Sequence, residues 1–151
     1  MPHSKRRIHA NRITPARVFR VRPDPGAPFI VEVRIARSRR RMLDEMRRLD
    51  GAEDIEDECM GLVRSWHYPS LRGAARLRAG RMVARMYLNV PDLRERPSEI
   101  VAHECAHAGM AWARWRGVNI KDMKGEEVMC YAVGRLVKQI NAIGYSMGVW
   151  A

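Results

Sequence analysis

Alternation of apolar and polar residues predicts four strands along the chain. Residues 17–22 and 29–36 alternate in this way, and residues 23–28 between them carry three prolines and a glycine, which is the chemistry of a turn. Residues 61–67 and 81–90 are two further stretches of strand character. We therefore expect a small, mostly antiparallel sheet whose first two strands are candidates for a hairpin.

Helical periodicity predicts three helices. Ser38 is a favourable N-cap for a helix at residues 38–49, which Gly51 ends. Residues 97–116 form a longer helix that ends at Gly117, and residues 125–142 form the third. The elements together predict an α+β fold, in which one domain over residues 17–151 follows a basic, flexible arm at residues 1–16.

The most specific chemistry lies in the second helix, in the HExxH sequence His103-Glu104-Cys105-Ala106-His107. Histidines at i and i+4 lie on one face of a helix, one turn apart, so both imidazoles can reach the same zinc ion. Glu104, beside the first histidine, is then placed to act as a general base on water. The competing interpretation is a helix that carries two solvated histidines and an exposed glutamate.

A catalytic zinc site has three protein ligands and one open position. No histidine follows His107, so a downstream third ligand must be Asp, Glu or Cys. Glu126 and Glu127, at the start of the third helix, are the natural candidates, although acidic residues at a helix N-terminus also suit the helix dipole. His67 is a weaker candidate.

This arrangement resembles the gluzincins, a group of zinc metallopeptidases that includes the thermolysin-like enzymes and the one-domain peptidases of phages and prophages. In that group the HExxH helix is followed, about twenty residues on, by a glutamate at the head of a second helix. Glu127, Cys130, Gly134 and the apolar pair Leu136-Val137 match the thermolysin-type glutamate helix. The resemblance covers about residues 81–140.

The resemblance implies a zincin-like fold and the hydrolysis of peptide bonds in a protein or peptide substrate. It implies that Zn²⁺ is held by His103, His107 and Glu127, and that Glu104 is the general base. Glu126 remains the alternate ligand because it lies on the apolar stripe of its helix.

Helical geometry puts Glu127, Cys130 and Gly134 on one face of the third helix. Because Cys130 and Gly134 are small, we expect this face to approach the HExxH helix closely. The two helices would then cross to form the zinc site.

Charge suggests an alternative class of function. The chain has 28 Lys and Arg residues against 17 Asp and Glu, a net charge of +11, which suits a polyanionic partner such as nucleic acid. No base-reading or stacking motif accompanies the charge. The alternative is a non-catalytic, zinc-binding, basic protein, of the kind found in phages, that contacts nucleic acid non-specifically through the arm at residues 1–16.

The remaining composition bears on the compartment. The chain has no apolar run of transmembrane length, so no membrane association is expected, and no apolar segment of a secretory signal follows the basic N-terminus. Three cysteines without a CxxC spacing argue against a disulfide framework. We expect a cytoplasmic protein with reduced thiols.

Overall fold

The computed structural model describes residues 17–26, 28–51, 61–65 and 82–150. The basic arm at residues 1–16 and the ligand candidate His67 lie outside these ranges. The four predicted strands and three predicted helices are all found within the described residues, together with one helix that the sequence pattern did not predict.

The strands form one sheet in the order β1-β2-β4-β3. β1 (Arg17–Val21) and β2 (Phe29–Ala36) pair antiparallel, which confirms the hairpin. β3 (Gly61–Ser65) pairs antiparallel with β4 (Met82–Asn89) at the opposite edge. The central pair, β2 with β4, is parallel, so the sheet is mixed and antiparallel at both edges.

Two of the predicted helices begin and end close to the expected residues because their local signals are strong. α1 (Arg39–Asp50) follows Ser38, whose side-chain oxygen accepts a hydrogen bond from a backbone N–H of the first turn, and it ends at Gly51 with a φ of 60°. α3 (Pro97–Arg116) has the predicted bounds, and Gly117 ends it with a φ of 72°.

The third predicted helix is longer than expected. α4 (Met123–Ser146) begins two residues earlier than predicted because the Asp122 carboxylate caps it, accepting a hydrogen bond from the Gly125 N–H at 2.7 Å. Among the described helices, none is long and apolar enough to span a membrane.

A short helix, α2 (Val90–Glu95), follows β4 directly, where the sequence pattern predicted only a turn that closes the strand. The Asn89 side chain caps α2 by accepting a hydrogen bond from the Asp92 N–H at 3.1 Å, and a proline in the first helical turn is compatible with such a start. The Asp92 carboxylate in turn accepts hydrogen bonds from Asn89 and Arg39. These contacts tie α2 to β4 and to α1.

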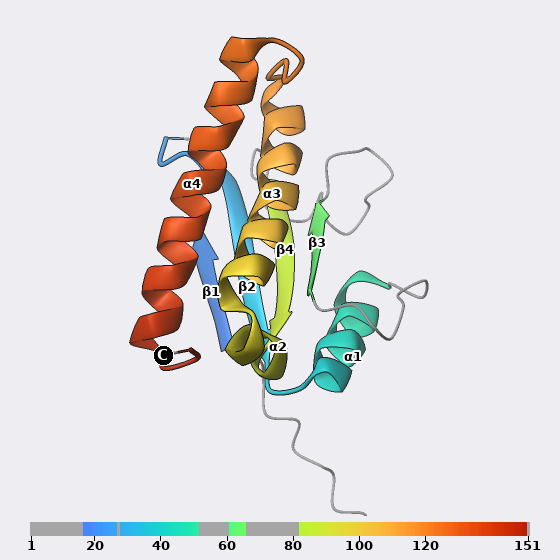
Figure 1. Cartoon of the computed structure of the whole chain (residues 1–151). Helices are drawn as coiled ribbons and strands as arrows, with labels where there is room; N and C mark the ends of the chain where they lie inside the picture. The colour runs from blue at the N-terminus through green and yellow to red at the C-terminus, as the bar shows by residue number, and fades with distance from the viewer. Residues whose placement is uncertain (1–16, 27, 52–60, 66–81, 151) are drawn as a thin grey trace, which may run out of the picture.

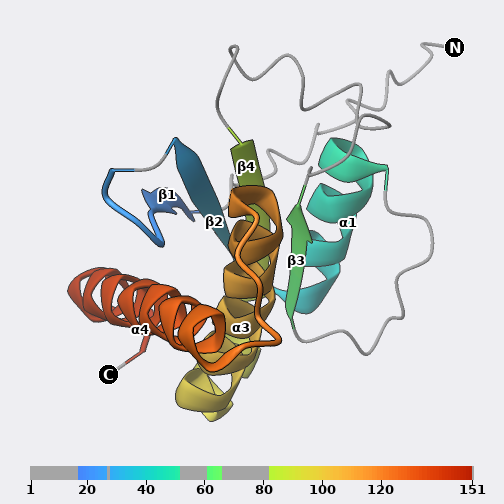
Figure 2. The ribbon, with the colours of Figure 1, turned by 90° about the horizontal axis from the view of Figure 1, so that it is seen from above.

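Helices cover both faces of the sheet (Figures 1 and 2). α3 and α4 pack against the face that carries Met86 and Leu88 of β4, and this side holds the larger core. Tyr87, between those two residues, points to the opposite face and packs with Met42 and Met46 of α1. Since both faces are covered, β2 is buried along almost its whole length.

The chain beyond α4 folds back on the domain. Trp150 is only 4% exposed, and its ring lies against Gly144 so closely that a Cβ at that position would overlap it. The guanidinium of Arg17, at the start of β1, donates a hydrogen bond to the Met147 carbonyl at 2.7 Å. The last residues of the described chain are therefore joined to the first strand.

Candidate metal centre

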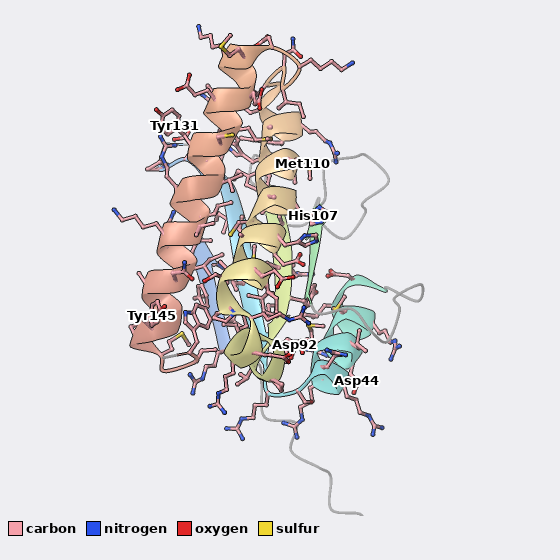
Figure 3. All side chains as sticks on the ribbon, in the orientation of Figure 1. Asp44, Asp92, His107, Met110, Tyr131 and Tyr145 are labelled. Atoms are coloured by element: carbon pink, nitrogen blue, oxygen red, sulfur yellow. The ribbon has the colours of Figure 1, made fainter. Side chains whose placement is uncertain are left out.

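The two histidines of the HExxH sequence lie together on the exposed side of α3. Their Nε2 atoms are 3.1 Å apart and their ring centroids 4.8 Å apart, with the planes inclined at 77°. In Figure 3 the His107 ring lies on the side of α3 that faces β3, away from α4. The predicted pairing of the two imidazoles on one helix face is found.

The spacing of the two nitrogens fits zinc. Two imidazole nitrogens bound to one tetrahedral zinc ion, at about 2.0–2.1 Å from the metal, are separated by about 3.3 Å. The observed 3.1 Å between the Nε2 atoms of His103 and His107 is close to this value. In a metal-free chain the same distance is that of a hydrogen bond, in which one neutral imidazole donates to the other.

Glu104 lies on the buried side of the histidine pair, about 60° around the helix from His107. The residue is 4% exposed, and within the described part of the chain its Oε2 atom has no hydrogen-bond partner. Burial raises the pKa of Glu104 to about 7. In the metal-free chain, a carboxyl with that pKa is well matched to accepting and releasing a proton near neutral pH.

The pKa of His107 is lowered, chiefly by burial and further by the charges of His103 and Arg114. A lowered pKa keeps the ring neutral at physiological pH, and only a neutral imidazole can bind a metal.

The predicted contact between α3 and α4 is wrong in its details. A Cβ added at Gly134 would meet nothing within 4 Å, so the small residues on that face of α4 do not bring the helices together. The close approach occurs instead at Gly109 of α3, where a Cβ would overlap the Val133 side chain of α4. The sequence could not single out Gly109, because Gly134 and Gly144 are also isolated glycines within a helix.

The position of Gly109 determines which side of α3 the fourth helix covers. At about 100° per residue, Gly109 lies roughly 120–160° around α3 from His103 and His107. α4 therefore packs away from the histidine pair. The two helices do pack together, but the histidines do not lie between them.

Glu127 is exposed on α4, as are Glu126 and Cys130. Tyr131, one turn after Glu127, is 63% exposed and points away from α3 in Figure 3. Within residues 17–26, 28–51, 61–65 and 82–150, no three His, Cys, Asp or Glu side chains lie close enough together to hold a metal. The structure thus brings together His103, His107 and Glu104 and does not bring Glu127 to them.

Comparison with known proteins adds no further information on the site. The chain matches no known family, no curated protein and no solved structure. The functional assignment rests on the residues of α3 and their surroundings.

Proposed function

We propose that the protein is a zinc-dependent hydrolase of peptide bonds, with His103 and His107 as metal ligands and Glu104 as the general base. One observation supports this most strongly: a pair of imidazole nitrogens at the spacing of zinc ligands lies beside a buried carboxylate whose Oε2 has no partner among the described residues. The competing interpretation requires an exposed glutamate, whereas Glu104 is buried.

Each residue has a separate part in the proposed reaction. A bound zinc ion would polarise the scissile carbonyl and lower the pKa of water. Glu104 accepts a proton from the attacking water and then passes it to the nitrogen of the leaving amine. His103 and His107, held one helical turn apart, provide two neutral nitrogen ligands.

The third protein ligand has three candidates: Glu127, its alternate Glu126, and His67. Glu127 has the gluzincin pattern in its favour, but it lies on the exposed face of α4 and forms no group with the histidines. His67 lies outside the described residues and follows the last residue of β3 by two positions in the sequence. β3 contacts α3, and His107 faces β3, so the position of His67 shortly after β3 in the sequence keeps it among the candidates.

The decisive experiment combines zinc analysis with a cleavage assay on fluorescein-labelled casein. We expect one zinc per wild-type chain, cleavage of casein, and loss of at least about 100-fold in cleavage rate in Glu104→Gln, with zinc retained. Glu99→Gln is the matched control because it makes the same change at an exposed position of α3. A wild-type chain without zinc, or a Glu104→Gln variant as active as Glu99→Gln, would refute the proposal.

The same zinc analysis identifies the third ligand. His103→Ala and His107→Ala should each lose most of the metal. Of His67→Ala, Glu127→Ala and Glu126→Ala, the variant that also loses zinc lacks the third ligand. Zinc loss in Glu127→Ala alone would give the gluzincin ligand set.

A further inference from the structure

A second candidate site lies away from the histidine pair, at the end of the sheet where β1 begins and β2 and β4 end. A cavity of about 430 Å³ opens there, and arginines Arg17, Arg37 and Arg94 line it. Its apolar surface comes from Ile35, Val90 and Val149.

The sheet topology brings these residues together from four separate segments. Arg17 pairs with Ile35 across the β1–β2 hairpin, and Arg37 follows β2 immediately. β4 ends beside β2 because the two are parallel, so α2 carries Arg94 to the same end. Figure 1 shows the start of β1, α2 and the end of α4 together at this end of the molecule, and Figure 3 shows nitrogen-tipped side chains projecting from it.

The three arginines differ from most others in the described chain because no carboxylate pairs with them. Arg17 donates only to the Met147 carbonyl, which orients its side chain without neutralising it, and Arg37 and Arg94 form no ion pair with the residues that the structure describes. Elsewhere, arginines are paired with acids: Arg20 and Arg34 with Glu32, Arg39 with Asp92, Arg47 with Asp44, Arg48 with Glu45, Arg85 with Asp50, Arg96 with Glu99, and Arg116 with Asp24.

We propose that this cavity binds the phosphates of a nucleic-acid strand, independently of base sequence. Guanidinium groups bind phosphate oxygens in a bidentate manner, and three of them around one opening favour an anion with more than one charge. The apolar surface provides a place for the sugar or base between phosphates. The ligand is assigned as a strand because the chain that leads into Arg17 carries Lys5, Arg6, Arg7 and Arg12 and no acidic residue.

The test uses Arg37→Ala/Arg94→Ala, which removes two exposed guanidiniums and retains Arg17 with its structural hydrogen bond. The matched control is Arg40→Ala/Arg48→Ala, which removes the same charge from two exposed arginines of α1 that do not line the cavity. Binding to a fluorescein-labelled 20-nucleotide single strand is measured by anisotropy between 50 and 200 mM NaCl. Thermal melting of both variants verifies that they fold like the wild type.

We expect the cavity variant to bind the strand at least about 10-fold more weakly at 100 mM NaCl. The slope of log affinity against log salt concentration should be smaller in magnitude by about 1.4, which is the value for two lost phosphate contacts on a single strand. The control should weaken less than about threefold, as spread charge does. Zinc content and casein cleavage should not change in either variant.

Three outcomes would overturn the proposal. Equal weakening of the cavity variant and the control would mean that binding follows net charge and uses no site. No measurable binding by the wild type at 50 mM NaCl would remove the ligand altogether. Displacement of the strand by micromolar AMP would make a free nucleotide the ligand instead of a strand.

Discussion

At the scale of single residues, Gly109 determines how α3 and α4 fit together. Its missing side chain leaves the space that Val133 occupies, so the two helices approach most closely at this point. Gly134, which the sequence pattern predicted to lie at this contact, has open space around it. The size of the side chain therefore affects the packing of α3 against α4 at position 109 and not at position 134.

The two glycines make a matched pair of substitutions. We expect Gly109→Ala to lower the free energy of unfolding by about 1–3 kcal/mol, because the added methyl group must displace Val133. Gly134→Ala should raise it by about 0.5–1 kcal/mol, since alanine favours a helix and meets no neighbour. Urea denaturation followed by circular dichroism measures both, and changes of the same sign would contradict the packing described here.

At the scale of elements, Asp92 joins α2 to its neighbours. Burial by itself would raise the pKa of Asp92, but the hydrogen bonds from Arg39 and Asn89 and the charges of Arg39 and Arg96 outweigh it, so the pKa lies below its usual value. A carboxylate of this kind stabilises the folded state above its unfolded pKa of about 4. It loses that contribution as the pH falls through the lower, folded-state pKa.

We expect Asp92→Asn to lower the free energy of unfolding by about 1–2 kcal/mol at neutral pH, and by progressively less as the pH falls below about 4. Asp44→Asn is the control, because Asp44 forms its 3.8 Å ion pair with Arg47 on the surface of α1. Its effect should stay below about 0.5 kcal/mol. Urea titrations between neutral pH and pH 3 measure both variants, and a pH-independent difference between Asp92→Asn and wild type would refute the role of the carboxylate.

The same part of the chain shows where reading elements from sequence fails. The hairpin was predicted well because residues 23–28 are rich in turn formers, and α1 and α3 because Ser38, Gly51 and Gly117 are local signals. α2 was missed because six residues that begin with Val90-Pro91 resemble the turn after a strand, and the cap from Asn89 becomes visible only in the folded backbone. The parallel pairing of β2 with β4 could not be predicted, since it joins segments separated by α1 and β3.

At the scale of the whole molecule, the C-terminal turn closes the structure onto its first strand. Trp150 fills space against Gly144, and Arg17 holds the Met147 carbonyl. The first contact lies at the end of α4, and the second joins residues at opposite ends of the described chain. These two contacts hold together the end of the domain that carries the arginine cavity.

Trp150→Ala should therefore lower the free energy of unfolding by about 3 kcal/mol, because it removes a large buried side chain. Tyr145→Ala serves as the control: its ring contacts Trp150 at a centroid distance of 6.0 Å but is 57% exposed. That variant should lose less than about 1 kcal/mol. Thermal and urea unfolding compare the two, and equal losses would mean that the tail contributes no core packing.

The sequence by itself determined most of the secondary structure and the pairing of His103 with His107. Both follow from short-range geometry: caps act within one turn, and residues four apart share a helix face whatever surrounds the helix. The expectation that Glu104 stands beside this pair follows from the same geometry. These features needed no knowledge of the rest of the molecule.

Only the tertiary structure decided the surroundings of that pair. Gly109 turns α4 away from the histidines, burial raises the pKa of Glu104 to about 7, and Glu127 remains exposed on the far helix. The arginine cavity likewise is formed by segments that lie far apart along the chain. The physical reason is common to all of these: burial, close packing and unpaired charge depend on neighbours that are distant along the chain.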